Sequence, residues 1–352
     1  MKAAEKLPVE YIEANNDDGD PIVTLIGADI SEAYLDDAEP SPTMAALGRF
    51  WSRIMKTAKF GLVLALVGGY PAMIAMSHKV DSSAVVLSSV TPWNSNDTGT
   101  AMTLLGRELS IAGWANDRAW WHPQAQLTAL PAWQEGIAGG LSEYAMLAAE
   151  HAAQTPGAPD TNLLAAARLL APAQEAEAIP RLNAAAVALQ GYEGGLSRGV
   201  AALPKGLGVL LDELNLYQSW AIQAQAELRS SADRAEGWPA SRQDIQALYK
   251  ARARAQVASQ LLMSSLIQEP ELVRTRDARE ARDRAIFAWR RAATFNPLVV
   301  SSQAGTGAFL SDHPAAMMYY LSEIDRATAD FIDALEKQDA EVISVADASA
   351  AE

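Results

Sequence analysis

The sequence contains no cysteine and none of the common catalytic signatures. Without cysteine the chain forms no disulfide, no thiolate metal site and no cysteine nucleophile. It also lacks a nucleophile elbow, a phosphate loop, a dinucleotide fingerprint and a zinc-protease helix. Its histidines show no spacing that places two metal ligands on one helix: His78, His122, His151 and His313. We therefore expect no metal and no cofactor, and we favour a non-catalytic protein.

Charge is abundant, but one uncharged run extends from Phe60 to Met76. At about 1.5 Å per residue, a helix over this run is about 25 Å long, close to the ~30 Å of a bilayer core. We predict a transmembrane helix over 60–77 that contacts the lipid bilayer. Four basic residues precede it, namely Arg49, Arg53, Lys56 and Lys59. The positive-inside rule then predicts a single-pass protein of the bacterial inner membrane, with its N-terminus in the cytoplasm and its bulk in the periplasm.

Two alternatives to a retained anchor remain open. Ala75 and Ser77 are small residues where a leader peptidase would cleave, so the run could end a signal peptide, although the segment before it is too long for one. The run could also be a buried helix of a soluble protein, although the basic cluster at one end argues against that. Cysteine usage does not decide the compartment, because an oxidising envelope accepts proteins with or without disulfides.

The approach to the run predicts a basic amphipathic helix over 43–59. Its apolar positions recur every three or four residues, and its basic residues occupy other angles. We expect Arg49, Trp51, Arg53, Lys56 and Lys59 to lie at the membrane surface, with Trp51 as an interfacial anchor. Inside the run, small residues fall four apart at Gly61, Ala65 and Gly69. That spacing suits close helix packing and dimerisation, or it merely kinks a single helix near Pro71.

Acidic residues dominate the first 42 positions. Up to Ala45 there are eleven acids against Lys2 and Lys6, which gives −9 of the chain's net −15. Low aromatic content, two prolines and this charge predict a disordered cytoplasmic tail. A nucleic-acid partner is not expected, because phosphate would repel the tail.

The region after the anchor, 80–340, is predicted to be an all-α multi-helix bundle. A Val- and Ser-rich connector over 80–90 comes first. Caps, prolines and apolar periodicity then predict helices over 98–113, 131–153, 161–171, 175–190, 203–236, 241–268, 270–295 and 314–337. The break at 154–160 is the best candidate boundary if the bundle has two layers divided near Pro156. Residues 341–352 are expected to be a disordered acidic tail.

One heptad seam runs through the 203–236 helix, with apolar residues alternating in steps of four and three. Its members are Leu203, Leu207, Leu210, Leu214, Tyr217, Ala221, Ala224 and Leu228. The seam must pack on neighbouring helices or on another copy of the chain.

Tryptophans gather in and just before the segment from Trp114 to Glu135. Five of the nine lie within about forty residues, at Trp93, Trp114, Trp120, Trp121 and Trp133. They could form a stacking surface for sugars, with Asp117 and Glu135 as the paired carboxylates of glycan cleavage. They could instead fix the loop against the bundle through their N–H groups, or form an interfacial aromatic belt.

Short motifs here resemble a known family. Trp114-Ala-Asn-Asp with Trp121-His-Pro, then Leu130-Pro-Ala-Trp-Gln-Glu-Gly136 and Leu310-Ser-Asp-His-Pro314, are similar to an uncharacterised bacterial envelope family, domain of unknown function 2333. The resemblance would cover most of the chain after the anchor. It implies a single-pass inner-membrane protein with a helical periplasmic domain, and it brings no catalytic residue with it.

From these features we expect a membrane-anchored envelope scaffold or interaction protein that binds another membrane or periplasmic protein, or self-associates. The alternative is a periplasmic glycan-directed enzyme or binder that uses the Trp-rich loop. The interaction candidates are Trp114, Trp120, Trp121, Trp133, Asp117 and Glu135.

Overall fold

The computed structural model separates into two compact units, Met1–Gly69 and Tyr70–Glu352. The residues that it describes are 13–15, 21–23, 42–64, 68–69, 73, 80–87, 93–153, 157–172, 177–232, 240–297, 300 and 312–350.

The first unit contains a short hairpin and one helix. Strand β1 (Glu13–Asn15) pairs antiparallel with β2 (Pro21–Val23), and Ala14 lies opposite Ile22. These strands correct the expectation of disorder for part of the acidic tail, because Ile22 and Val23 are β-branched and favour extended backbone. The rest of positions 1–41 lies outside the described residues.

Helix α2 (Pro42–Leu64) contains the amphipathic helix predicted over 43–59. The predicted span over 60–77 is described only in part, because its first five residues end α2 and only Gly68, Gly69 and Met73 are described beyond them. Among the described helices, none combines the length and the apolar character that crossing a membrane needs.

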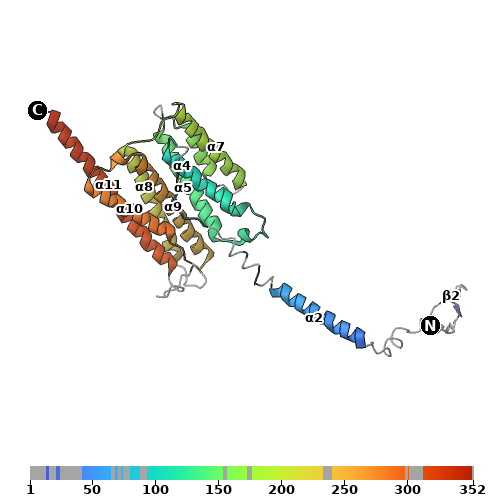
Figure 1. The fold of residues 1–352 in the computed structure, drawn as a ribbon. Coiled ribbons are helices and arrows are strands. Elements are labelled where there is room, and N and C mark those ends of the chain that lie inside the picture. Colours follow the sequence, from blue (N-terminus) through green and yellow to red (C-terminus); the bar gives the residue numbers. More distant parts are fainter. Residues whose placement is uncertain are drawn as a thin grey trace. The chain divides into compact units, whose positions relative to one another are not determined.

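The second unit is a helical bundle, which confirms the all-helical prediction for this region (Figure 1). Its α-helices are α4 (Asn96–Arg107), α5 (Ala129–His151), α6 (Thr161–Leu170), α7 (Ala178–Ser197), α8 (Leu207–Ala232), α9 (Arg242–Gln268), α10 (Arg276–Thr294) and α11 (His313–Ala350). Helices α4 to α7 form one group, and α8, α10 and α11 form a second group. Helix α9 packs on both groups, so one hydrophobic core runs through the described bundle. The predicted boundary near 156 falls between α5 and α6, which pack on each other within the first group.

Small residues explain why α9 lies at the centre. It packs most extensively on α5, where Gly136 faces Ala253 so closely that an added Cβ would stand 2.6 Å from the alanine methyl. Because neither residue has a large side chain, the two backbones approach each other, and fully buried alanines continue the contact along α9.

The heptad seam packs inside the bundle. Six of its members are buried, from Leu210 to Leu228, and α8 contacts α11 and α9. The buried part of the seam therefore packs on neighbouring helices of the same chain.

Helix boundaries differ from prediction at several places, and α7, for example, ends at Ser197 instead of residue 190. Pro270 begins only a single 3₁₀ turn (Pro270–Leu272), and α10 starts at Arg276 after its N-cap Thr275. The cause is a tertiary contact, because Gln338 of α11 accepts hydrogen bonds from the amides of Arg274 and Thr275 at 2.7 and 2.9 Å. The predicted disordered tail over 341–352 is wrong for 341–350, which continue α11. No proline or glycine follows Pro314 to stop that helix.

Candidate functional site

The Trp-rich segment forms the wall of a cleft at one end of the first helix group. It runs from a π-helical turn (Glu108–Ala112) through two 3₁₀ turns, Ala115–Asp117 and Pro123–Gln126, into α5. Trp114 is 4% exposed and Trp133 is fully buried, so both fix the segment to the core. Gln134 reinforces it by accepting from the amide of Ala115 at 2.9 Å and donating to the carbonyl of Gly113 at 2.8 Å.

Asp117 caps helix α7. Its two carboxylate oxygens accept hydrogen bonds from the amides of Ala178 and Ile179 at 3.0 and 2.7 Å. Amides at a helix N-terminus have no intrahelical acceptor, and the helix dipole favours a negative charge there. Both oxygens of Asp117 are therefore engaged, which fits a structural role better than that of a free catalytic carboxylate.

Glu135 lies in the same cleft with different partners. It pairs with Lys250 of α9 at 3.2 Å and accepts from the side-chain amide of Asn116 at 3.1 Å. Opposite it, Arg181 donates to the carbonyls of Leu169 and Ala171, which closes the end of α6.

The cleft has an empty volume of about 1120 Å³, part of it open to solvent. Its polar lining consists of Asn116, Asp117, Glu135, Arg181 and Lys250, and Trp114 lies among them. Two cations and two carboxylates face one space, which suits a polar ligand that bears hydroxyl groups or both signs of charge.

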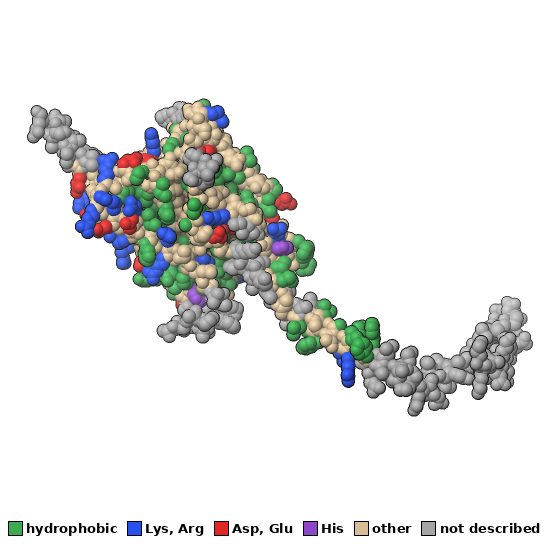
Figure 2. Space-filling model, in the orientation of Figure 1, with side chains coloured by type: hydrophobic (Ala, Val, Ile, Leu, Met, Phe, Trp, Pro, Cys, Tyr) green, Lys and Arg blue, Asp and Glu red, His purple; other side chains and the backbone are tan. Residues whose placement is uncertain are grey.

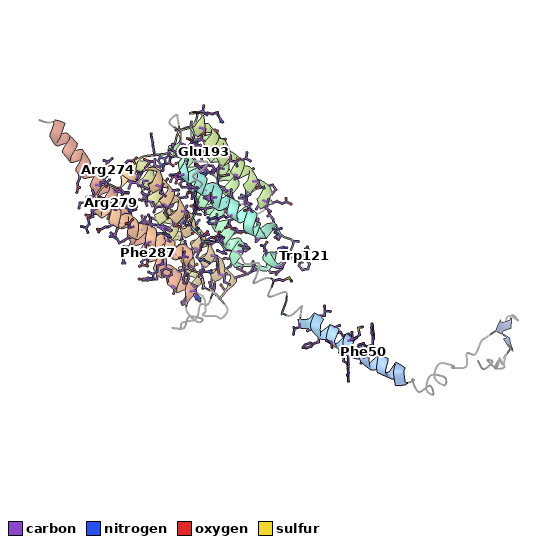
Figure 3. The ribbon with its side chains drawn as sticks, viewed as in Figure 1. Phe50, Trp121, Glu193, Arg274, Arg279 and Phe287 are labelled. Atoms are coloured by element: carbon purple, nitrogen blue, oxygen red, sulfur yellow. The ribbon has the colours of Figure 1, made fainter. Side chains whose placement is uncertain are left out.

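Two other tryptophans point outward. Trp120 is 81% exposed and Trp121 is 62% exposed, and Figure 3 shows Trp121 projecting from the edge of the bundle. Figure 2 shows hydrophobic side chains at the same edge. The loop that carries them is held in place, because Gln126 donates to the carbonyl of Trp120 and His122 caps the second 3₁₀ turn. Of the predicted tryptophans, Trp114 and Trp133 are therefore buried and fix the segment to the core, whereas Trp120 and Trp121 are exposed at its surface.

The predicted membrane-surface residues lie on the first unit. Trp51, Arg53, Lys56 and Lys59 are all exposed on α2, and Trp51 is 63% exposed. Of the predicted helix-packing residues, Gly61 and Gly69 have no atom within 4 Å of an added Cβ. The side chain of Arg49 and the whole of Ala65 lie outside the described residues.

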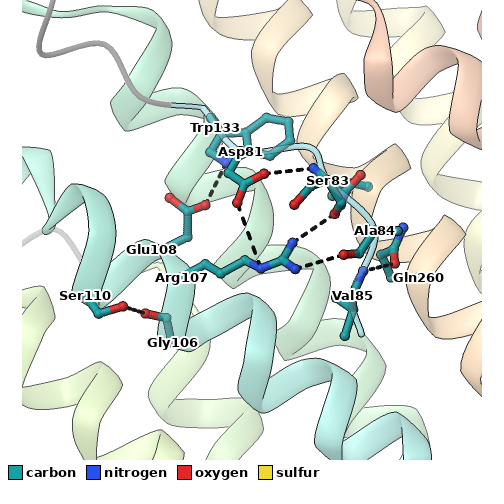
Figure 4. A network of polar contacts seen from close by, with 11 residues as sticks. Asp81, Ser83, Ala84, Val85, Gly106, Arg107, Glu108, Ser110, Trp133 and Gln260 are labelled. Atoms are coloured by element: carbon teal, nitrogen blue, oxygen red, sulfur yellow. Dashed lines mark hydrogen bonds and ion pairs between the residues drawn. The ribbon is translucent and has the colours of Figure 1, made fainter. Parts of the chain in front are cut away.

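Sequence reasoning missed a buried carboxylate, Glu108, in the π-helical turn. It is 4% exposed, and its Oε1 accepts from the indole N–H of Trp133 at 2.8 Å (Figure 4). Its Oε2 has no partner among the described residues. Burial raises the pKa of Glu108 to about 7 against the lowering effects of Trp133, Gln134 and Arg107, and the nearby Asp81 also raises it. The sequence could have indicated that Glu108 is buried, because it lies on the same helical stripe as the apolar residues Ala101 and Leu104.

Beside Glu108, the connector over 80–87 is tied to the bundle (Figure 4). Arg107 donates to the carbonyls of Ser83 and Ala84 at 2.8 and 2.9 Å, and the amide of Val85 donates to Gln260 at 2.7 Å. This described part of the predicted connector is neither helix nor strand, and its backbone hydrogen-bonds to side chains of α4 and α9 and to its own Asp81.

A second missed cluster lies deeper in the bundle. Asp97 and Glu213 both reach Ser265, and Glu269 lies beside them. The side chain that caps α4 is Ser95, and the Asp97 side chain turns towards α9 instead.

No family model matches this chain, and comparisons with curated proteins and with solved structures find no match either. The resemblance to domain of unknown function 2333 therefore stays a prediction.

Proposed function

We propose that this chain is a non-catalytic, membrane-anchored envelope scaffold that binds another membrane or periplasmic protein through the loop carrying Trp120 and Trp121. The supporting observation is the exposure of these two adjacent indoles on a loop whose ends are fixed. Tryptophan is enriched among the few residues that dominate protein interfaces, and a fixed loop loses little entropy on binding. Because the heptad seam of α8 is buried, it does not support self-association of the bundle. A second copy would instead pack on the predicted transmembrane helix at Gly61, Ala65 and Gly69.

The anchor is part of the same proposal. Exposed apolar and basic side chains on α2 suit the inner leaflet of the bacterial inner membrane, with 60–77 as the span. The full chain should stay in the membrane fraction after alkaline extraction, and a variant that lacks 60–77 should be released. Release of the full chain would contradict the anchor.

Photocrosslinking in cells tests the interaction surface. A probe in place of Trp121 should capture one defined envelope protein other than this chain, and a probe in place of Val187, which is 66% exposed on α7, should not. Replacing Trp120 by alanine should weaken the captured complex by about 2 kcal/mol or more. Equal capture at both positions, or capture at neither, would contradict the proposal.

The cleft supports a second candidate, a glycan-directed binder or enzyme. Trp114, Asp117 and Glu135 line one space, so two carboxyl groups and an indole come together there. Incubation with purified peptidoglycan distinguishes the two proposals. Cleavage products that disappear with Glu135→Gln, or glycan captured at position 121 without protein, would favour this second function over the first.

A further inference from the structure

One serine hydroxyl lies between two carboxyl groups in the core of the bundle. Ser265 Oγ is 3.0 Å from Oδ1 of Asp97 and 3.0 Å from Oε2 of Glu213. A hydroxyl has one hydrogen to donate, and an ionised carboxylate can only accept. If both carboxyl groups were ionised, one of these two contacts would contain no hydrogen.

The other donors around the pair do not remove this shortage. Ser264 also donates to Oδ1 of Asp97, and the Tyr144 hydroxyl of α5 reaches both carboxyl groups. Glu269 adds a third carboxyl group, whose oxygens accept from the amide of Gly206 at 2.8 and 3.2 Å. Within the described residues, the groups that act electrostatically on Asp97 and Glu213 include no lysine and no arginine.

Tyr217 is a separate observation at the same place. It follows Glu213 by one helical turn, its side chain is 0% exposed, and its hydroxyl has no partner among the described residues. Glu213 and Asp97 both act on that hydroxyl and, after burial, raise its pKa. A fully buried polar group thus faces the carboxyl pair from α8, as Tyr144 does from α5.

We infer that Asp97 and Glu213 form a binding site for a proton, in which neutral Glu213 donates to Ser265 and Ser265 donates to ionised Asp97. This arrangement places one hydrogen between Ser265 and each of the two carboxyl groups, while the carbonyl of Leu261, 3.1 Å from Ser265 Oγ, remains a third acceptor. It removes one negative charge from the place where Asp97, Glu213 and Glu269 meet. Burial raises the pKa of Glu213 well above its usual range and that of Asp97 to about 6. Glu213 is therefore the group of the pair that keeps its proton to the higher pH, and Asp97 takes up a second one as the pH falls through about 6.

The surroundings suit a proton better than a metal ion. In the part of the chain that the structure describes, no three side chains are arranged to hold a metal. A small cavity lined by Asp97, Glu213, Ser265 and Glu269 gives protons a route to the pair. Protonation here would act on the N-terminus of α4, the second turn of α8 and the C-terminal turn of α9 together. On α7, Tyr192 is the titratable group near Asp97, and burial raises its pKa as well.

Infrared spectroscopy of the full-length chain tests the site, because a neutral carboxylic acid has its own carbonyl band. All variants carry Glu108→Gln, so that the acid of Glu108 contributes nothing. At neutral pH the parent should show a neutral-acid band that Glu213→Gln removes and Asp97→Asn retains. A second band should appear below about pH 6 in the parent and be absent from Asp97→Asn. Asp212→Asn is the matched control, an exposed neighbour on α8 that should change neither band.

Two outcomes would overturn the inference. One is the absence of a neutral-acid band from the parent at neutral pH, and the other is a band that survives Glu213→Gln in a protein with unchanged helicity. If Glu213→Gln does not fold, Ser265→Ala provides the test, since it keeps both carboxyl groups. Without the Ser265 hydroxyl to accept its hydrogen bond, the neutral acid of Glu213 should show a shifted carbonyl band. An unshifted band would also overturn the inference.

Discussion

Replacing Glu108 by glutamine should stabilise the protein at alkaline pH and leave it nearly unchanged in acid. Folding takes this carboxyl group out of water, provides one indole donor and leaves Oε2 without a partner among the described residues. The folded state therefore prefers the neutral acid. Because its pKa is raised from 4.5 to about 7, its contribution to stability is fully present below pH 4.5 and is lost as the pH rises through 7.

The magnitude follows from the size of the shift. Each pKa unit corresponds to about 1.36 kcal/mol, so the rise at Glu108 corresponds to about 3 kcal/mol of stability between the acid and alkaline limits. The side chain is almost completely buried, so solvent screening reduces this only slightly. Glutamine keeps the oxygen that accepts from Trp133 and cannot ionise, which removes the loss.

Urea unfolding of the full-length chain across this pH range measures the effect. The stability difference between Glu108→Gln and the parent should grow by about 3 kcal/mol from below pH 4.5 to above pH 7. Asp97 titrates in part of the same range but does so in both proteins, so the difference isolates Glu108. Glu150→Gln, an exposed position on α5, is the control and should give parallel curves. Parallel curves for Glu108→Gln itself would refute the reasoning.

Three further predictions concern packing and capping, each measured by urea unfolding at neutral pH. Gly136→Ala should destabilise the protein by about 1 to 3 kcal/mol, because its methyl group would lie 2.6 Å from the Ala253 methyl group of α9. Gly139→Ala is the control, because the added methyl group has open space and should stabilise the helix by up to about 1 kcal/mol. Equal effects at the two glycines would contradict the close approach of α5 and α9. Leu214→Ala should cost about 2 to 5 kcal/mol without changing the oligomeric state, whereas the exposed Ile222→Ala should cost little; a change of oligomeric state would mean that the seam serves another copy. Asp117→Ala should cost about 1 kcal/mol through loss of the α7 cap, and an unchanged stability would argue against that role.

Much of the fold was predictable because helix signals are local. At the start of α9, where a helix was predicted from 241, Ser241 and Asp244 form a capping box, with Ser241 accepting from the Asp244 amide at 3.2 Å and Asp244 from the Ser241 amide at 3.1 Å. The apolar stripe of α8 is buried where the heptad pattern placed it. Caps and stripes depend on residues three or four apart, which any sequence displays directly.

The candidate site was predictable only in part. Trp114, Asp117 and Glu135 do line one cleft, as their clustering indicated. Their roles were not readable, because Asp117 acts on α7, some sixty residues further along the chain, and Lys250 of α9 neutralises Glu135. Which tryptophans are buried likewise depends on the helices that pack over them.

The sequence by itself determined which segments form helices and which stripe each helix must bury. Only the tertiary structure decided what those stripes pack against, and where carboxyl groups became buried as a consequence. Asp97 and Ser265 are 168 positions apart, and no local pattern relates them. The pKa of a carboxyl group depends on the water and charges around it, and packing brings those together from distant parts of the chain.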